Sequence, residues 1–168
     1  MRRFLSSLII TSCLLGSLPS VTWAQNGITI FSGVKSGSEL PYRLDFGGNT
    51  NDWDRYRLRI PQKKLTTAVQ KFVITYPDYY EGEFDTDEVE IKVQGKKVKV
   101  SEVKWDKEGS LLEIYPQEII PAGKKVEISL SNVRNPSFGG MYYFRCLTQS
   151  PGDVPLPRMC GTWIISID

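Results

Sequence analysis

The stretch Arg55-Tyr56-Arg57-Leu58-Arg59-Ile60 decides the fold class, because its basic and apolar residues alternate without a break. Successive side chains of an extended strand point to opposite faces, so this stretch places three apolar residues on one face and three arginines on the other. That pattern is typical of an antiparallel strand with one face on the core and the other in water. Pro61 follows, and its missing N–H ends the strand.

The same two-residue period recurs along the rest of the chain, and no long helical period does. The tight turn Gln94-Gly95 predicts a hairpin, and a slip in the alternation at Ser101-Glu102 predicts a β-bulge. The only helical candidate is the short segment 62–69. The further strands are predicted at 71–76, 89–93, 98–105, 111–115, 125–130, 141–147 and 163–167.

Eight or nine short strands separated by turns predict an all-β protein. We expect an immunoglobulin-like antiparallel β-sandwich, with a jelly roll as the alternative and one short helix at most. Residues 53–168 form the predicted sandwich domain. Residues 25–52 form a Gly-rich, polar N-terminal segment in which 28–31 is a candidate edge strand.

The N-terminus has the layout of a secretory signal peptide. Two arginines come first, residues 4–18 carry no charge and are mainly apolar, and small residues precede Ala24. We therefore expect residues 1–24 to be cleaved and the remainder to reach the periplasm or the extracellular space with no transmembrane segment. The alternatives are an uncleaved anchor and a lipid-modified Cys13; the position of Cys13 in the middle of the apolar run argues against the second.

Composition excludes several classes of function. Without residues 1–24 the chain has 144 residues, one ordinary domain, and loses two of its 21 basic residues, so that 19 basic residues balance 19 acidic ones. No basic field for nucleic acid is expected. The sequence contains no histidine, which excludes Ser-His-Asp and Cys-His hydrolases and histidine metal sites.

Cys146 and Cys160 remain after signal cleavage and are predicted to form a disulfide, which would stabilise the fold by roughly 3 kcal/mol. A redox pair and a pair of metal thiolates are the alternatives. The proline-rich segment 150–158, which ends at Arg158, lies between the two cysteines. Its rigidity suits either a binding site or a plain connection between strands.

An acidic turn follows the strand predicted at 71–76. Its carboxylates could bind calcium, although the spacing is not that of an EF-hand, and a solvated acidic connection is the alternative. Two carboxylates across a groove would also suit glycoside hydrolysis. The candidate calcium ligands are Asp78, Glu81, Glu83, Asp85, Asp87 and Glu88.

Aromatic residues near this turn and near Gly139-Gly140 are candidate binding residues. Tyr79 and Tyr80 lie within the turn. Tyr142 and Tyr143 are consecutive strand residues, so at least one of them must be exposed. Exposed rings stack on sugars or anchor protein partners, whereas cross-strand pairing is the plainer alternative.

Five segments resemble a family of exported cyanobacterial proteins described only as a domain of unknown function. They are DRYRLRIP (54–61), VRNP (133–136), GGMYYF (139–144), PGDVPLPR (151–158) and CGTWIISI (160–167). The resemblance implies a bacterial envelope or secreted location, with the thylakoid lumen as one option, and supplies no catalytic residues.

Together these observations favour an exported, non-enzymatic binding or structural module of the cell envelope. Its expected partner is an envelope protein or a polysaccharide, and no cofactor is required. The alternatives are a calcium-dependent carbohydrate-binding domain and, third, a small glycoside-processing enzyme.

Overall fold

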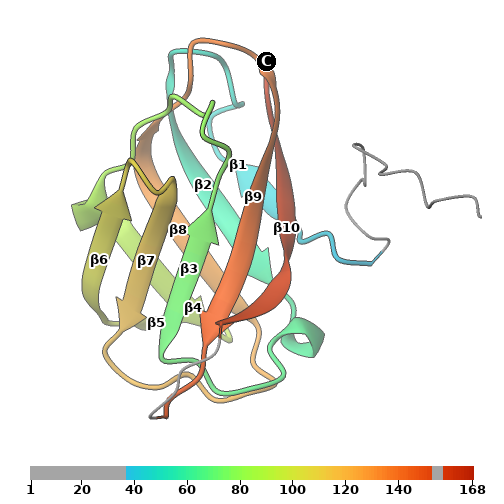
Figure 1. Ribbon diagram of the computed structural model, residues 1–168, viewed down its shortest axis with the longest axis vertical. Helices are drawn as coiled ribbons and strands as arrows, with labels where there is room; N and C mark the ends of the chain where they lie inside the picture. Colours follow the sequence, from blue (N-terminus) through green and yellow to red (C-terminus); the bar gives the residue numbers. More distant parts are fainter. Residues whose placement is uncertain (1–36, 153–156) are drawn as a thin grey trace, which may run out of the picture. The chain divides into compact units, whose positions relative to one another are not determined.

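The computed structural model describes residues 37–152 and 157–168, which form two five-stranded antiparallel sheets packed face to face (Figure 1). The predicted signal peptide, the candidate strand 28–31 and residues 153–156 of the proline-rich segment lie outside the described residues. The first sheet contains, in spatial order, β1 (Tyr42–Leu44), β2 (Trp53–Ile60), β8 (Val126–Arg134), β4 (Val89–Val93) and β5 (Lys96–Val98). The second contains β10 (Pro157–Ile167), β9 (Gly140–Gln149), β3 (Lys71–Thr75), β7 (Leu111–Pro116) and β6 (Val100–Asp106).

The decisive strand behaves as its alternation predicts. In β2 the apolar side chains of Tyr56, Leu58 and Ile60 are fully buried. The arginines on the other face form ion pairs: Arg57 Nε lies 2.8 Å from an Asp45 carboxylate oxygen, and Arg59 Nε lies 2.8 Å from a Glu127 oxygen. The core between the sheets is completed by large, fully buried side chains from the second sheet, among them Trp163, Phe72, Phe144, Ile74, Leu112 and Ile114.

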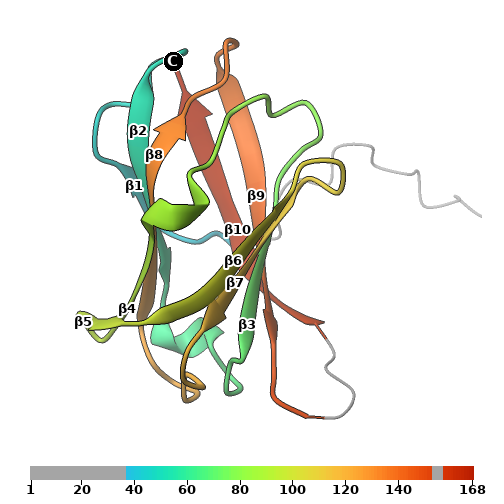
Figure 2. The same ribbon diagram turned by 90° about the vertical axis from the view of Figure 1, so that its left-hand side faces the viewer.

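One side of the sandwich is closed by the chain itself. Residues 38–40 lie beside β10, where Thr162 donates its N–H to the Ser38 carbonyl at 2.9 Å and Leu40 donates to the Thr162 carbonyl at 2.8 Å. The chain then continues into β1 of the other sheet. On the opposite side β5 and β6 are the outermost strands, and the chain crosses from the first sheet to the second between them (Figure 2).

The predicted turn and bulge are confirmed. Gln94 and Gly95 both have positive φ, 52° and 82°, as the tight hairpin between β4 and β5 requires. The register of β6 shifts between Val100 and Glu102. The single strand predicted at 98–105 is divided, however: the chain leaves the first sheet at Lys99, so that β5 and β6 belong to different sheets.

The helical candidate 62–69 is a single 3₁₀ turn at Gln62–Lys64. The remainder is not helical because Val69 exchanges both backbone hydrogen bonds with Ile120, at 2.8 and 2.9 Å. A second 3₁₀ turn, η2 (Thr86–Glu88), precedes β4. The strand β1 was not predicted, since three residues are too short to show a period.

Candidate binding surface at the loop end

Exposed apolar side chains gather at one end of the sandwich, at the top of Figure 1, where the β1–β2, β3–β4 and β8–β9 connections and the C-terminus lie. We call this surface the apolar end. Its members are between 56% and 72% exposed, whereas large apolar side chains are normally buried. The apolar end consists of Phe46, Trp53, Tyr79, Phe138 and Met141.

A buried carboxylate holds the loop that carries Phe46. Asp54 is only 1% exposed, and its oxygens accept the backbone N–H of Phe46 at 3.0 Å and of Gly48 at 2.8 Å. It also accepts the N–H of Arg55 at 2.6 Å. A carboxylate with several N–H donors is a strong local anchor, so the β1–β2 loop has a defined shape.

A buried polar network lies beneath the same loops. The Tyr56 hydroxyl donates to the Asn135 side-chain oxygen at 2.6 Å and lies 3.0 Å from the Tyr80 hydroxyl. Asn135 in turn donates its amide to the Asn49 carbonyl at 2.7 Å. Burial raises the pKa of both tyrosines well above the ordinary value, so both stay neutral hydrogen-bonding groups. The network joins the β1–β2, β3–β4 and β8–β9 loops, so buried hydrogen bonds fix the conformation of the loops at the apolar end.

The predicted tyrosines divide between surface and interior. Tyr79 belongs to the apolar end, and its ring lies 5.8 Å from that of Tyr142. Tyr143 is the exposed member of the consecutive pair, as one of the two had to be. Tyr80 and Tyr142 are buried at 4%, and they support the loops from within, Tyr142 through a 2.7 Å hydrogen bond to the Phe138 carbonyl. Neither offers a surface to a partner.

Arg158 lies apart from these tyrosines. It is exposed, and its guanidinium donates to the Thr66 hydroxyl at 3.3 Å. It lies at the start of β10, whereas the apolar end adjoins the end of that strand, where Ser166 pairs with Met141. The structure therefore does not bring Arg158 together with the aromatic candidates.

The sequence reasoning selected neither Phe46 nor Trp53. A usable signal was present, because both aromatic residues stand within segments of turn formers: Phe46 before Gly47-Gly48, and Trp53 between Asp52 and Asp54. A large apolar residue inside a turn, such as Phe46, or at the first position of a strand, such as Trp53, has little strand face on which to be buried, so it tends to be exposed.

The acidic turn does not form a ligand cluster. Asp85 caps η2 by accepting the Asp87 N–H at 3.1 Å, and it accepts the Asn132 amide at 3.2 Å. Glu83 exchanges backbone hydrogen bonds with Arg134. Within residues 37–152 and 157–168, no three acidic or cysteine side chains are placed to hold one metal ion.

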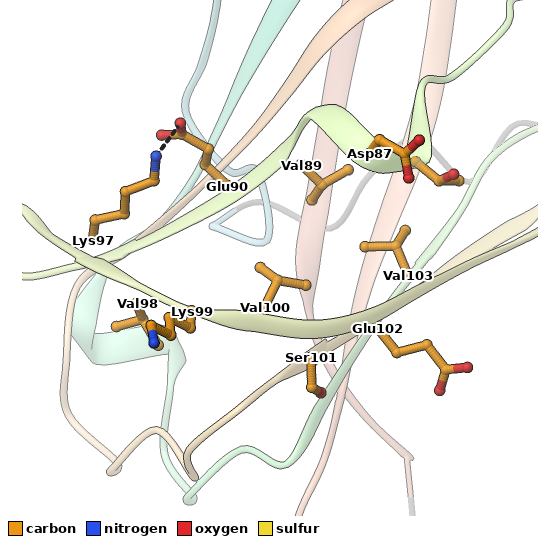
Figure 3. Close-up of a pocket in the computed structure, with 11 residues that line it drawn as sticks. Asp87, Val89, Glu90, Lys97, Val98, Lys99, Val100, Ser101, Glu102 and Val103 are labelled. Carbon is orange, nitrogen blue, oxygen red and sulfur yellow. Dashed lines mark hydrogen bonds and ion pairs between the residues drawn. The ribbon is translucent and has the colours of Figure 1, made fainter.

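A groove of about 530 Å³ lies between η2 and the start of β4 on one side and the segment formed by β5 and β6 on the other (Figure 3). Its apolar lining is Val89, Val98, Val100 and Val103, and polar side chains of η2, β5 and β6 surround it. Figure 3 shows the Glu90–Lys97 ion pair, at 2.6 Å, on one rim.

The predicted disulfide between Cys146 and Cys160 is not formed, and both cysteines are free and buried. Cys146 pairs with Gly161, and the register shift just before Gly161 makes Cys160 the bulged residue. Burial raises the pKa of Cys146, which remains a thiol. A hydrogen bond from Cys146, aided by the Thr148 hydroxyl, lowers the pKa of Cys160 to about 7. The spacing placed the two residues together correctly, but a disulfide also requires a specific approach of the sulfurs.

The described part of the chain contains no helix of the length and hydropathy needed to cross a membrane. Its two antiparallel sheets form an immunoglobulin-like β-sandwich, which confirms the predicted fold class. The bacterial hydrophobin BslA has a similar fold, with 14% identity, a TM-score of 0.50, and coverage of 77% of this chain and 92% of that one. The collagen-binding domain of a Staphylococcus aureus adhesin is similar at 10% identity and a TM-score of 0.45, covering 76% of this chain and 95% of that one.

The chain belongs to the family described as "Protein of unknown function (DUF2808)", whose model matches residues 28–167. No curated protein matches the sequence. A solved, uncharacterized Nocardia farcinica protein with an immunoglobulin-like fold is similar at 11% identity and a TM-score of 0.39, over 77% of this chain and 97% of that one. The family model establishes the family, and the two-sheet topology, together with the similarity to BslA, establishes the fold.

Proposed function

We propose that this protein is an exported, non-enzymatic binding or structural module of the cell envelope and that the apolar end is its contact surface. The observation that carries the proposal is the position of the exposed apolar side chains. Of the eight large ones in the described residues, five belong to the apolar end; Tyr143 follows Met141 on the same face of β9, and only Ile119 and Met159 lie in other parts of the fold. Large apolar side chains that are exposed at one end of a domain, rather than scattered singly over its surface, are candidates for an interaction site.

Preorganisation supports the same conclusion. The loops that present Phe46, Trp53 and Phe138 are held by Asp54 and by the Tyr56–Asn135 hydrogen bonds. A surface that is already ordered loses little conformational entropy on binding. The expected partner is an envelope protein or a polysaccharide, since aromatic rings anchor protein contacts and stack on sugar faces.

The test compares two ends of the same molecule. The chain from Gln25 onward is titrated against envelope polysaccharide and, separately, against envelope protein fractions, as wild type and as Trp53→Ser with Phe138→Ser. Ile119→Ser, at the opposite end, is the matched control. We expect the double variant to lose binding and the control to retain it; equal binding by all three would refute the proposal.

Tryptophan fluorescence gives an independent readout of the same contact. Trp53 is exposed, Trp105 is partly buried and Trp163 is fully buried, so acrylamide quenches Trp53 most strongly in the free protein. Binding at the apolar end should protect Trp53 from the quencher. Repeating the polysaccharide titration with calcium and with a chelator distinguishes this mode from calcium-dependent carbohydrate recognition.

A further inference from the structure

The strand β6 ends the second sheet, and within the described residues it pairs only with β7 (Figure 2). In an antiparallel pair only alternate residues direct their backbone groups to a given neighbour. Gln117 donates its N–H to the Lys99 carbonyl at 2.9 Å. Pro116, which has no N–H, occupies the next position. The odd-numbered residues of β7 therefore bond to β6.

The register then identifies the free backbone groups of β6. Glu102 lies opposite Tyr115 and Lys104 opposite Glu113, so these two residues use their backbone groups on β7. Val103, between them, directs its N–H and C=O away from β7. It therefore presents a donor and an acceptor at the sheet edge, ready to pair with another strand.

The side chains on either side of Val103 carry opposite charges. Glu102 and Lys104 lie on the outer face of the sheet, with their side chains about half exposed and a 3.3 Å ion pair between them. Val103 points to the groove on the other face, as Figure 3 shows for Val103 and Glu102. Along the free edge of β6, an acidic residue, a valine and a basic residue therefore follow one another: Glu102, Val103 and Lys104.

We propose that β6 pairs antiparallel with β6 of a second copy of this chain, about a two-fold axis at Val103. In this register Val103 faces Val103 of the second copy and the two exchange backbone hydrogen bonds. Glu102 then lies opposite Lys104 of the second copy, and Lys104 opposite its Glu102. The surface is complementary to itself, as a two-fold interface requires.

Charged residues on an edge strand usually prevent pairing with other chains. Here they do the opposite, because their spacing matches them under the two-fold rotation. Opposite charges directly across two strands stabilise the pair, and like charges destabilise it. Each attraction also occurs twice in a symmetric dimer, and together they form a ring of four alternating charges on the outer face.

The inner face contributes apolar contact. Val100 and Val103 of β6 line the groove with Val89 and Val98. Pairing of two β6 strands places two such grooves side by side and removes part of their apolar lining from water. The dimer joins the two second sheets into one continuous sheet, and it leaves both apolar ends free.

Charge exchange tests the register. Glu102→Lys and Lys104→Glu each place like charges opposite one another twice, and each should weaken dimerisation at least about tenfold in sedimentation velocity. The double variant Glu102→Lys with Lys104→Glu restores the complementarity and should dimerise like the wild type. A mixture of the two single variants should form the heterodimer, although each alone is monomeric.

Two further variants show whether a loss of dimerisation reflects the edge of β6 rather than a general effect of charge or of misfolding. Lys125→Glu makes the same charge change in the exposed loop before β8 and should dimerise normally. Val103→Pro removes an N–H that has no partner within the fold and should abolish the dimer while thermal unfolding stays cooperative. A wild-type protein that stays monomeric throughout the dilution series, or single variants that do not form the heterodimer on mixing, would overturn the proposal.

Discussion

Replacing Asp54 by alanine tests how the apolar end is built. Hydrogen bonds to a charged acceptor contribute roughly 1.5–3 kcal/mol each. Asp54 accepts two from distant backbone positions, Phe46 at 3.0 Å and Gly48 at 2.8 Å. Since the loop is near the surface, water can replace part of the lost bonding. We therefore expect the free energy of unfolding to fall by about 3 kcal/mol, toward the lower end of the sum.

Urea denaturation followed by circular dichroism measures this change, and the slope with denaturant should stay constant because the same surface is exposed on unfolding. Hydrogen exchange should show the amides of Phe46 and Gly48 losing protection. Asp54→Asn keeps the shape but presents one acceptor oxygen in place of two, so it should cost about 1–2 kcal/mol. Asp52→Ala, at an exposed neighbouring carboxylate, is the control. An unchanged free energy of unfolding for Asp54→Ala, with normal protection at both amides, would refute the role assigned to Asp54.

Three further predictions concern the interior. Gly161→Ala should lower the free energy of unfolding by at least about 2 kcal/mol in urea, because the new methyl would strike the chain that closes the sandwich; Gly37→Ala shares the positive φ but meets no atom within 4 Å and should cost less. Since burial raises the pKa of Tyr56, the unfolded state loses the hydroxyl proton first as pH rises above about 10, and the free energy of unfolding should fall above that pH. Tyr56→Phe should lower the free energy of unfolding by about 1 kcal/mol at neutral pH. It should also reduce the fall in stability at alkaline pH. Native-state alkylation followed by mass spectrometry should modify Cys160 before Cys146, since the pKa of the first is lowered to about 7 and that of the second is raised; equal labelling would contradict this.

Much of the fold follows from local patterns in the sequence. The alternation in Arg55–Ile60 determines which face is buried, because the side-chain period of a strand is two. The turn Gln94-Gly95 has positive φ at both residues; Gly95 adopts it without steric cost, and the two-residue hairpin holds Gln94 there as well. The absence of histidine excludes whole classes of chemistry with no reference to structure. In each case the inference needs only neighbouring residues or composition.

What the sequence could not show depends on residues far apart in the chain. The division of the strand predicted at 98–105 depends on where the two sheets diverge. Cys146 and Cys160 come together as predicted, but only the packing around the bulge decides that their sulfurs remain separate thiols. Asp54 looks like an ordinary turn residue until its partners at Phe46 and Gly48 are seen.

The apolar end shows the same limit. Its members come from three loops and the strand ends beside them, which are separate in sequence, so no local period connects Phe46 with Phe138. Hydrophobicity drives such residues toward a core, and only closure of the sandwich decides which of them find no place in it. The alternating residues of Arg55–Ile60 thus specified a two-faced strand by themselves, whereas the binding surface and the free edge of β6 arise only when the strands have been ordered into two sheets.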